Sequence, residues 1–202
     1  VYDSAGMTLE EVLAVMEEAQ EAGQEVVRLH TGDPSLYGAI REQMDALDER
    51  GIPYDDTPGV SSFSGAAAAL CAEYTLPGIS QSVIITRMAG RTPVPQGEQL
   101  RAMASHGCTM VLFLSTGLLE QVEKELQAGG YPPDTPAAIV YKATWPEEKV
   151  LRCTVSTLAA TARENHITKT ALITIGNFLG KNYERSKLYD PEFSHGCREA
   201  SR

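Results

Sequence analysis

The sequence has neither a long apolar run nor an excess of positive charge. No hydrophobic stretch approaches the ~20 residues that a helix needs to cross a bilayer, so we expect no membrane-spanning segment and no membrane partner. The formal net charge of the 202 residues is −10 at pH 7. This charge argues against non-specific binding to nucleic acid, because such binding depends on clustered lysine and arginine. An anionic ligand would have to be recognised by a local group of basic residues.

The sequence also lacks the cysteine spacing that is typical of zinc sites and disulfide frameworks. It contains no C-x-x-C pair, and its four cysteines are widely separated: Cys71, Cys108, Cys153 and Cys197. Cys108 and Cys197 each end a His-Gly-Cys triplet, and such a triplet could supply half of the ligands of a metal site. Because no C-x-x-C pair accompanies them, chance is the better explanation of both triplets. The first residues are polar and lack the basic start of a signal peptide. We therefore expect no metal and a cytoplasmic protein with reduced thiols.

Two nucleotide-binding motifs are missing as well. The chain contains neither G-x-G-x-x-G nor G-x-x-x-x-G-K-[ST]. These motifs bring backbone N–H groups close to phosphates. The sequence thus gives no support to a dinucleotide or nucleoside triphosphate site.

One stretch, residues 26–38, combines the signals of a strand, a turn and a helix. Val26 to Leu29 are mostly apolar and follow Gly23, which predicts a short buried strand. Thr31-Gly32-Asp33-Pro34 is a cluster of turn formers, in which glycine permits a positive φ and proline suits the first turn of a helix. The next apolar residues recur at helical spacing and predict a helix that ends before Gly51: Leu36, Ile40, Met44 and Leu47.

This arrangement places Gly32 and Asp33 at the carboxyl end of a strand, where open α/β sheets bind their ligands. A capped turn without a ligand would use the same residues, so both interpretations stay open. A second loop of this kind, residues 58–64, precedes an alanine-rich helix that Ser61 or a neighbouring serine would cap. The small residues of that helix would suit either the close approach of a ligand or tight packing against the sheet.

Capping signals and hydrophobic spacing predict the remaining elements. Thr8 and Glu11 form a capping box at the start of a helix that ends near Gly23. Further helices are predicted at residues 98–105, 119–128 and 157–165, and strands at residues 52–56, 82–85, 109–114, 137–141, 149–155 and 170–176. Strands that alternate with helices of this length predict an α/β protein. A loop-like stretch at residues 74–80 divides it into two predicted domains, residues 1–78 and residues 79–202.

Taken in order, several blocks resemble the tetrapyrrole (corrin/porphyrin) methyltransferases. These blocks are Gly32-Asp33-Pro34-Ser35-Leu36-Tyr37-Gly38, the 58–62 loop with its alanine run, and Thr86-Arg87-x-x-Gly90-Arg91-Thr92-Pro93. Within that family the chain most resembles the branch that methylates C11 of precorrin-4 or cobalt-precorrin-4. The segments that narrow the resemblance to this branch are residues 41–44, 145–150 and 183–193. The resemblance covers essentially the whole chain, and the order and spacing of the blocks are more specific than any single block.

The resemblance implies two α/β domains that hold S-adenosylmethionine (SAM) in the cleft between them. It implies that the protein transfers a methyl group to a carbon of a precorrin in cobalamin biosynthesis. It also implies a homodimer. Cofactor contacts are implied at Thr31, Gly32, Asp33, Leu36, Ser61, Ser62, Leu114, Ser115, Ala143, Thr170, Ala171 and Leu172. Arg87 and Arg91 lie in a loop rich in proline and glycine, and two guanidinium groups there would hold the carboxylate arms of the tetrapyrrole. A solvated linker would have the same composition, and no residue is assigned as a catalytic base.

The chain departs from the family pattern at its first residues. Family members begin with a strand and a G-x-G-x-G-D-P-type loop, and nothing like it precedes Val1, so the resemblance implies an incomplete first domain. Other functions stay open from the sequence. They are another precorrin or uroporphyrinogen methyltransferase, a non-catalytic tetrapyrrole-binding module, and a nucleotide-binding oxidoreductase, against which the missing glycine motif argues. Binding of SAM and of a tetrapyrrole would separate them.

Overall fold

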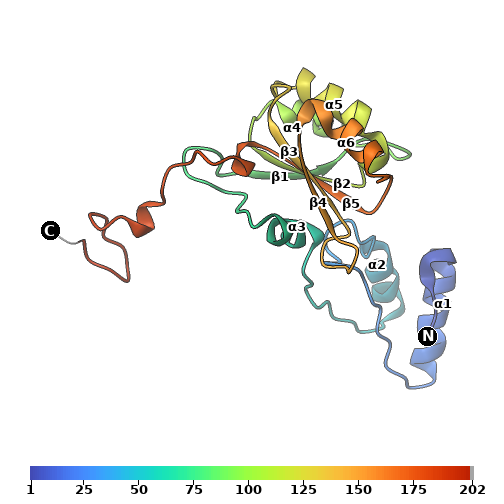
Figure 1. The fold of residues 1–202 in the computed structure, drawn as a ribbon. Helices are drawn as coiled ribbons and strands as arrows, with labels where there is room; N and C mark the ends of the chain where they lie inside the picture. Colours follow the sequence, from blue (N-terminus) through green and yellow to red (C-terminus); the bar gives the residue numbers. More distant parts are fainter. Residues whose placement is uncertain (201–202) are drawn as a thin grey trace. The chain divides into compact units, whose positions relative to one another are not determined.

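A computed structural model describes residues 1–200, which form two compact units (Figure 1). The first unit is Val1–Ser62, and the second begins at Phe63. The domain boundary that the sequence predicts, after residue 78, stays a prediction. Each unit is described by itself below, beginning with the smaller one.

The first unit is built around two helices. Helix α1 spans Leu9–Glu21 and α2 spans Arg41–Arg50. The predicted capping box at Thr8 is confirmed: its hydroxyl accepts the Glu11 N–H, and the Glu11 carboxylate accepts the Thr8 N–H. The buried apolar side chains of this unit join the two helices: Leu13, Met16 and Leu47.

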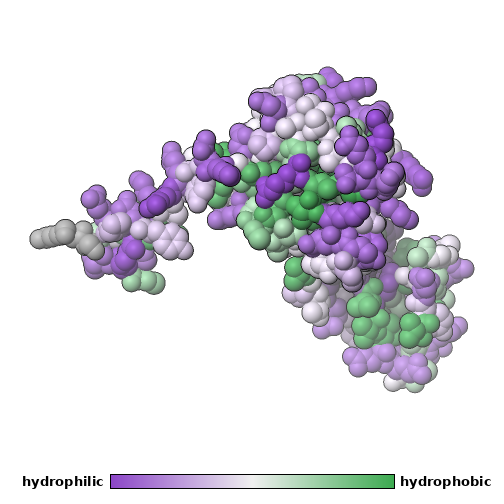
Figure 2. Space-filling model, in the orientation of Figure 1, coloured by the Kyte–Doolittle hydropathy of each residue, from purple (hydrophilic) through white to green (hydrophobic). Residues whose placement is uncertain are grey.

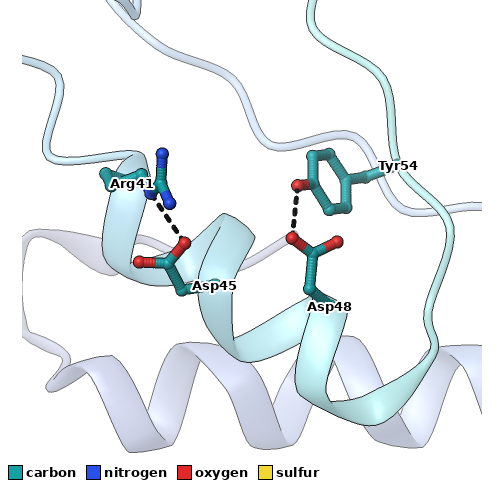
Figure 3. A network of polar contacts seen from close by, with 4 residues as sticks. All are labelled: Arg41, Asp45, Asp48 and Tyr54. Atoms are coloured by element: carbon teal, nitrogen blue, oxygen red, sulfur yellow. Dashed lines mark hydrogen bonds and ion pairs between the residues drawn. The ribbon is translucent and has the colours of Figure 1, made fainter.

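Figure 3 shows two polar contacts of α2, one within the helix and one to the chain that follows it. Arg41 and Asp45 form an ion pair one helical turn apart, at 2.6 Å. The Tyr54 hydroxyl donates to the Asp48 carboxylate at 3.2 Å. The strand predicted at residues 52–56 is wrong, since this segment has no strand pairing and is held by Tyr54 instead.

The strand predicted at residues 26–29 is also wrong. The segment has no ladder hydrogen bonds, and no strand forms anywhere in residues 1–62. A β-strand depends on a neighbour that takes up its backbone donors and acceptors. Without one, Val27 is 80% exposed and Leu29 is 83% exposed. Apolar surface is visible on this unit at the lower right of the space-filling view (Figure 2).

The predicted helix at residues 36–47 begins later than expected, at Arg41. Tyr37 and Ala39 have positive φ, 61° and 51°, which a right-handed helix does not allow. The turn is also tight at Gly38, where a Cβ atom would lie 2.1 Å from the Pro34 carbonyl oxygen. The helix then ends as predicted, on Gly51 with φ 64°.

The second unit contains one five-stranded mixed sheet. Its strands are β1 (Val83–Arg87), β2 (Thr109–Phe113), β3 (Pro136–Tyr141), β4 (Lys149–Thr154) and β5 (Ala171–Ile175). Their order across the sheet is β1-β2-β5-β3-β4, with β1 and β2 parallel and the other pairs antiparallel. All five strands were predicted within a few residues. The α/β class is therefore confirmed.

Helices cover both faces of this sheet (Figure 1). Helices α4 (Leu100–Ala104), α5 (Leu119–Ala128) and α6 (Leu158–Glu164) pack on the face that carries Met110, Leu112 and Ile173. Helix α3 (Ser62–Leu70) packs on the face that carries Val111. Alternate residues of β2 thus enter different cores, as the two-residue period of a strand requires.

The alanine-rich helix α3 has small residues because it lies close to the sheet. Ala66 is fully buried, in the same cluster as Ala138 and Leu172. A Cβ added at Gly65 would lie 3.6 Å from the Ala143 and Thr144 side chains. Of the two interpretations of this helix, tight packing accounts for its composition.

Candidate functional site at one end of the sheet

The second unit gathers its predicted site residues at one end of the sheet. Strands β2 and β3 are both antiparallel to β5, so they run in the same direction as each other and as β1. Tyr141, the last residue of β3, pairs with Ala171, the first residue of β5, and Arg87 pairs with Phe113. This end therefore collects Arg87, Leu114, Ser115, Ala143, Thr170, Ala171 and Leu172.

The backbone at this end of the sheet is strained. Four non-glycine residues beside the strand ends have positive φ: Leu114 (52°), Lys142 (47°), Thr144 (71°) and Thr170 (58°). Such conformations cost free energy and persist where the surrounding structure fixes them, commonly at ligand sites. Leu114 is also 72% exposed, although it follows the most deeply buried strand.

Two buried hydroxyls fix these turns. The Ser115 hydroxyl is buried, accepts the Met88 N–H at 2.8 Å and donates to the Phe113 carbonyl at 2.6 Å. The Thr116 hydroxyl donates to the Ala171 carbonyl at 3.0 Å. Ser115 thus joins the loops after β1 and β2, and its side chain is committed to that contact. The sequence predicted Ser115 as a cofactor residue without indicating this structural role.

The two predicted substrate arginines differ in their surroundings. Arg87 donates to the carbonyls of Thr92, at 3.2 Å, and Pro93, at 2.7 Å, so its guanidinium group holds the loop after β1. Arg91 is exposed, and within residues 1–200 it has no hydrogen bond or ion pair. Arg91 is therefore the arginine whose side chain is available to an external carboxylate.

The loop after β3 carries two residues that sequence reasoning did not name as site residues, although Trp145 opens the segment 145–150 on which the resemblance depends. The ammonium group of Lys142 lies 4.9 Å from the centroid of the Trp145 ring, and Trp145 is 51% exposed. The signal in the sequence was that Trp145 is the single tryptophan of the chain. The same loop contains Ala143, which is half-buried and would lie 3.6 Å from a Cβ atom added at Gly65 of α3.

The first unit joins its two predicted loops through Asp33. One carboxylate oxygen of Asp33 accepts the Gly59 N–H at 3.0 Å, and the other accepts the Ser35 N–H at 2.9 Å and the Ser35 hydroxyl. These hydrogen bonds, first of all that of the Ser35 hydroxyl, lower the pKa of Asp33 below its usual value. Asp33 is therefore ionised at neutral pH, and both of its oxygens hold the loops together.

Two glycines allow these loops to approach each other. Gly32 has φ 73°, and a Cβ atom there would lie 3.6 Å from Ser61 Cα and Ser62 N. A Cβ on Gly59 would lie 2.0 Å from the Gly32 carbonyl oxygen, which no side chain tolerates. The structure thus brings together Gly32, Asp33, Ser61 and Ser62, with Thr31 exposed and Leu36 half-buried beside them. The expectation that this group and the group in the second unit share one cleft stays a prediction.

The cysteines and acidic residues of residues 1–200 form no metal centre. No three His, Cys, Asp or Glu side chains of this range lie close enough to hold a metal ion. All four cysteines are free. Burial raises the pKa of the Cys153 thiol to about 11, so this thiol is protonated and unreactive at neutral pH. Within the same range, no helix is long and apolar enough to cross a membrane.

Comparison with known proteins supplies the context for this geometry. Residues 1–159 match the family model of tetrapyrrole (corrin/porphyrin) methylases. The chain is 50% identical over 201 residues to cobalt-precorrin-4 C(11)-methyltransferase of Methanocaldococcus jannaschii. This match covers 99% of this chain and 78% of the relative. It is 42% identical over 191 residues to precorrin-4 C(11)-methyltransferase of Mycobacterium tuberculosis, covering 94% of this chain and 76% of the relative.

Solved structures agree with these relationships. The X-ray structure of the cobalt-precorrin-4 methyltransferase CbiF matches with a TM-score of 0.88 and 49% identity, over 90% of this chain and 76% of that one. Uroporphyrin-III C-methyltransferase from Thermus thermophilus, in complex with S-adenosyl homocysteine, matches with a TM-score of 0.68 and 26% identity. The latter match covers 84% of this chain and 74% of that one.

Proposed function

Because the chain belongs to the tetrapyrrole methylase family, we propose that it is a SAM-dependent methyltransferase that acts at C11 of precorrin-4 or cobalt-precorrin-4, in cobalamin biosynthesis. The observation that carries this proposal is the 50% identity over 201 residues to a cobalt-precorrin-4 C(11)-methyltransferase. A uroporphyrinogen-III C-methyltransferase of Bacillus subtilis is only 32% identical, over 164 residues. The C11 branch is therefore favoured over the other methyltransferases of the family, and membership of the family argues against an oxidoreductase.

The residues at the end of the sheet fit SAM. Leu114 exposes an apolar side chain from a strained backbone position, which packing within the second unit does not explain. Ala143 and Ala171 place small side chains at the same end, so that a ligand can approach the backbone there. A partly apolar ligand that also needs backbone hydrogen bonds suits this surface. We propose that Leu114, Ala143, Thr170, Ala171 and Leu172 hold SAM.

The first unit contributes a second set of contacts in this proposal. Gly32 exposes its backbone in a left-handed conformation, and Asp33 fixes the loop through Gly59 and Ser35. We propose that Thr31, Gly32, Asp33, Leu36, Ser61 and Ser62 contact SAM from this side. In this role Asp33 acts mainly through the loops it joins, because its oxygens already accept hydrogen bonds from the chain.

The chemistry requires alignment more than it requires a reactive side chain. When bound, SAM supplies an electrophilic methyl group on its sulfonium. The protein has to hold the acceptor carbon in line with that group, at about 3–3.5 Å, which contributes several kcal/mol to lowering the barrier. The hydrogen bonds of Ser115, Thr116 and Asp33 hold the turns that would provide such positioning. No side chain is assigned as the base that takes up a proton from the macrocycle.

We propose that Arg91 recognises the carboxylate arms of the substrate and that Arg87 supports it. Arg87 holds the carbonyls of Thr92 and Pro93 and so fixes the loop on which Arg91 lies. An exposed guanidinium group on a fixed loop can form the paired hydrogen bonds that a carboxylate accepts. Arg91 would thus supply the local positive charge that an anionic substrate needs in a chain whose net charge is −10.

Methyl transfer tests the proposed function. The purified chain is incubated with SAM and with enzymatically prepared cobalt-precorrin-4 or precorrin-4, and the product is analysed by mass spectrometry and by NMR of the methylated carbon. We expect the mass of one methyl group to be added at C11, with stoichiometric S-adenosyl homocysteine. Methylation of uroporphyrinogen III instead would contradict the C11 assignment. Binding of both ligands without transfer would support a non-catalytic module.

We also propose that the protein is a cytoplasmic homodimer. Its four cysteines are free thiols, the form that a reducing compartment maintains. Exposed apolar side chains on the described residues offer surface for a second copy, among them Tyr183, Leu188 and Tyr189. Light scattering coupled to size-exclusion chromatography tests the assembly, and a monomer at micromolar concentration would contradict it.

A further inference from the structure

The loop between β3 and β4 has a fixed shape. The Lys142 N–H donates to the Thr170 carbonyl at 3.0 Å, and the Trp145 N–H donates to the Lys142 carbonyl at 3.0 Å. The Glu148 carboxylate accepts the Thr144 N–H at 2.7 Å. Lys142 and Thr144 both have positive φ. These contacts hold a strained backbone in one conformation, so the side chain of Trp145 projects from a rigid base.

The indole of Trp145 is held by a cation and belongs to neither core of the second unit, as far as the described residues show. Lys142 Nζ lies 4.9 Å from the Trp145 ring centroid and 5.5 Å from that of Tyr141, within the range of cation–π attraction. The same ammonium group lies 3.5 Å from Glu147, and the Lys142 side chain is only 21% exposed. Lys142 therefore fixes the indole from one side, while 51% of Trp145 is exposed.

We propose that the exposed face of Trp145 is the surface on which the tetrapyrrole macrocycle stacks, and that Lys142 is the residue that positions the indole. Large exposed aromatic rings on rigid loops bind conjugated ring systems by stacking. The Lys142 ammonium group is already paired with Glu147 and the indole, so the exposed indole face, and not a free cation, is the surface that this loop offers to a flat ring system. This inference rests on the proposed function and deepens it, since it names a substrate contact that the arginine loop does not include.

The single tryptophan makes the inference directly measurable. All indole fluorescence of the chain comes from Trp145, and we use uroporphyrin III as a stable tetrapyrrole probe. We expect uroporphyrin III to quench this emission at saturation. Absorbance titration of Trp145→Ala should give about tenfold weaker binding of the probe, and Trp145→Phe should retain part of the affinity. Tyr2→Ala is the matched control, because Tyr2 is also an exposed aromatic residue, at 67%.

Lys142 variants separate positioning from a merely structural role. Lys142→Arg should keep near wild-type affinity for uroporphyrin III, because a guanidinium group also stacks on indole, whereas Lys142→Met should lose several-fold. Equal losses in both variants would contradict the positioning role. Binding of S-adenosyl homocysteine, measured by calorimetry, should change less than twofold in Trp145→Ala.

The outcomes distinguish this inference from the function on which it rests. If the wild-type chain binds uroporphyrin III and Trp145→Ala binds it equally well, the stacking inference is wrong and the proposed function stands. If Trp145→Ala loses S-adenosyl homocysteine instead, the indole belongs to the cofactor site and the inference is again wrong. If the wild-type chain binds no uroporphyrin III, the stacking inference is wrong, and the proposed function is decided separately by methyl transfer to precorrin-4 or cobalt-precorrin-4.

Discussion

The two units contain similar apolar segments, but these segments form strands only in the second unit. In the second unit, apolar runs such as Met110–Leu112 pair with strands on both sides and are fully buried. In the first unit, the apolar run at residues 26–29 has no strand partner, and Val27 and Leu29 lie exposed. The pairing partner thus decides whether a strand forms, since β4, which contains Lys149 and Arg152, forms a strand by pairing with β3. The first unit is held by one small helix contact and by hydrogen bonds between loops.

The largest expected effect is on amide exchange. Amides at residues 110–112 should exchange several orders of magnitude more slowly than those at residues 26–29, because the former open only with the sheet and the latter have no ladder bonds. Hydrogen–deuterium exchange followed by mass spectrometry measures both segments in one experiment. Equal protection of the two segments would show that a strand does form in the first unit.

Within the second unit, Ser115→Ala should lower stability. The change removes a buried hydroxyl that makes two hydrogen bonds and leaves the Met88 N–H without its acceptor, at a cost of about 1–3 kcal/mol. Thermal unfolding measures the loss. Ser105→Ala is the control, since the Ser105 hydroxyl makes one exposed contact at a helix end and should cost under about 0.5 kcal/mol. Similar losses of stability in both variants would contradict a structural role for the Ser115 hydroxyl.

In the first unit, Gly59→Ala should force the two loops apart. The new methyl group would lie 2.0 Å from the Gly32 carbonyl oxygen, and such overpacking costs about 1–3 kcal/mol. Because the clash is confined to the first unit, exchange protection of β2 should stay unchanged. Gly97→Ala, where nothing lies within 4 Å of the added atom, is the matched control. A normal loop conformation in Gly59→Ala, seen by NMR, would contradict the close approach.

The smallest expected effect concerns pH. The pKa of Asp33 is lowered in the folded state, so its carboxylate stabilises the loops at pH values above the ordinary value of 3.8. This contribution should be lost as the pH falls below that value and through the lowered pKa. Asp33→Asn should remove this contribution, so that first-unit amides exchange faster than in the wild type at neutral pH and at a similar rate at acid pH, which flattens the acid-side dependence. An unchanged acid profile in this variant would show that other carboxylates account for it.

The sequence predicted the second unit well, and the reason is physical. Strand β2 is a run of apolar residues between turn formers, and the helices around it have apolar residues at helical spacing. The capping box at Thr8 was equally readable, since it depends on residues three positions apart. These signals are local and need no knowledge of distant neighbours.

The features that the sequence did not reveal depend on distant contacts. Tyr37 and Ala39 adopt positive φ, which delays α2, and neither residue type indicates such a conformation. Ser115 was predicted as a ligand contact, but its hydroxyl is committed to Met88, a residue on another strand's loop. The stacking of Lys142 on Trp145 likewise follows from the strained turn that brings them together.

Calorimetric binding of S-adenosyl homocysteine tests the central proposal most directly, namely that the predicted residues of each unit contact SAM. We expect saturable one-to-one binding by the wild-type chain, with weakened binding in Gly59→Ala of the first unit and in Ala143→Leu of the second. Gly97→Ala should bind as the wild type does. Absence of binding by the wild-type chain, or unchanged binding in either Gly59→Ala or Ala143→Leu, would contradict this proposal.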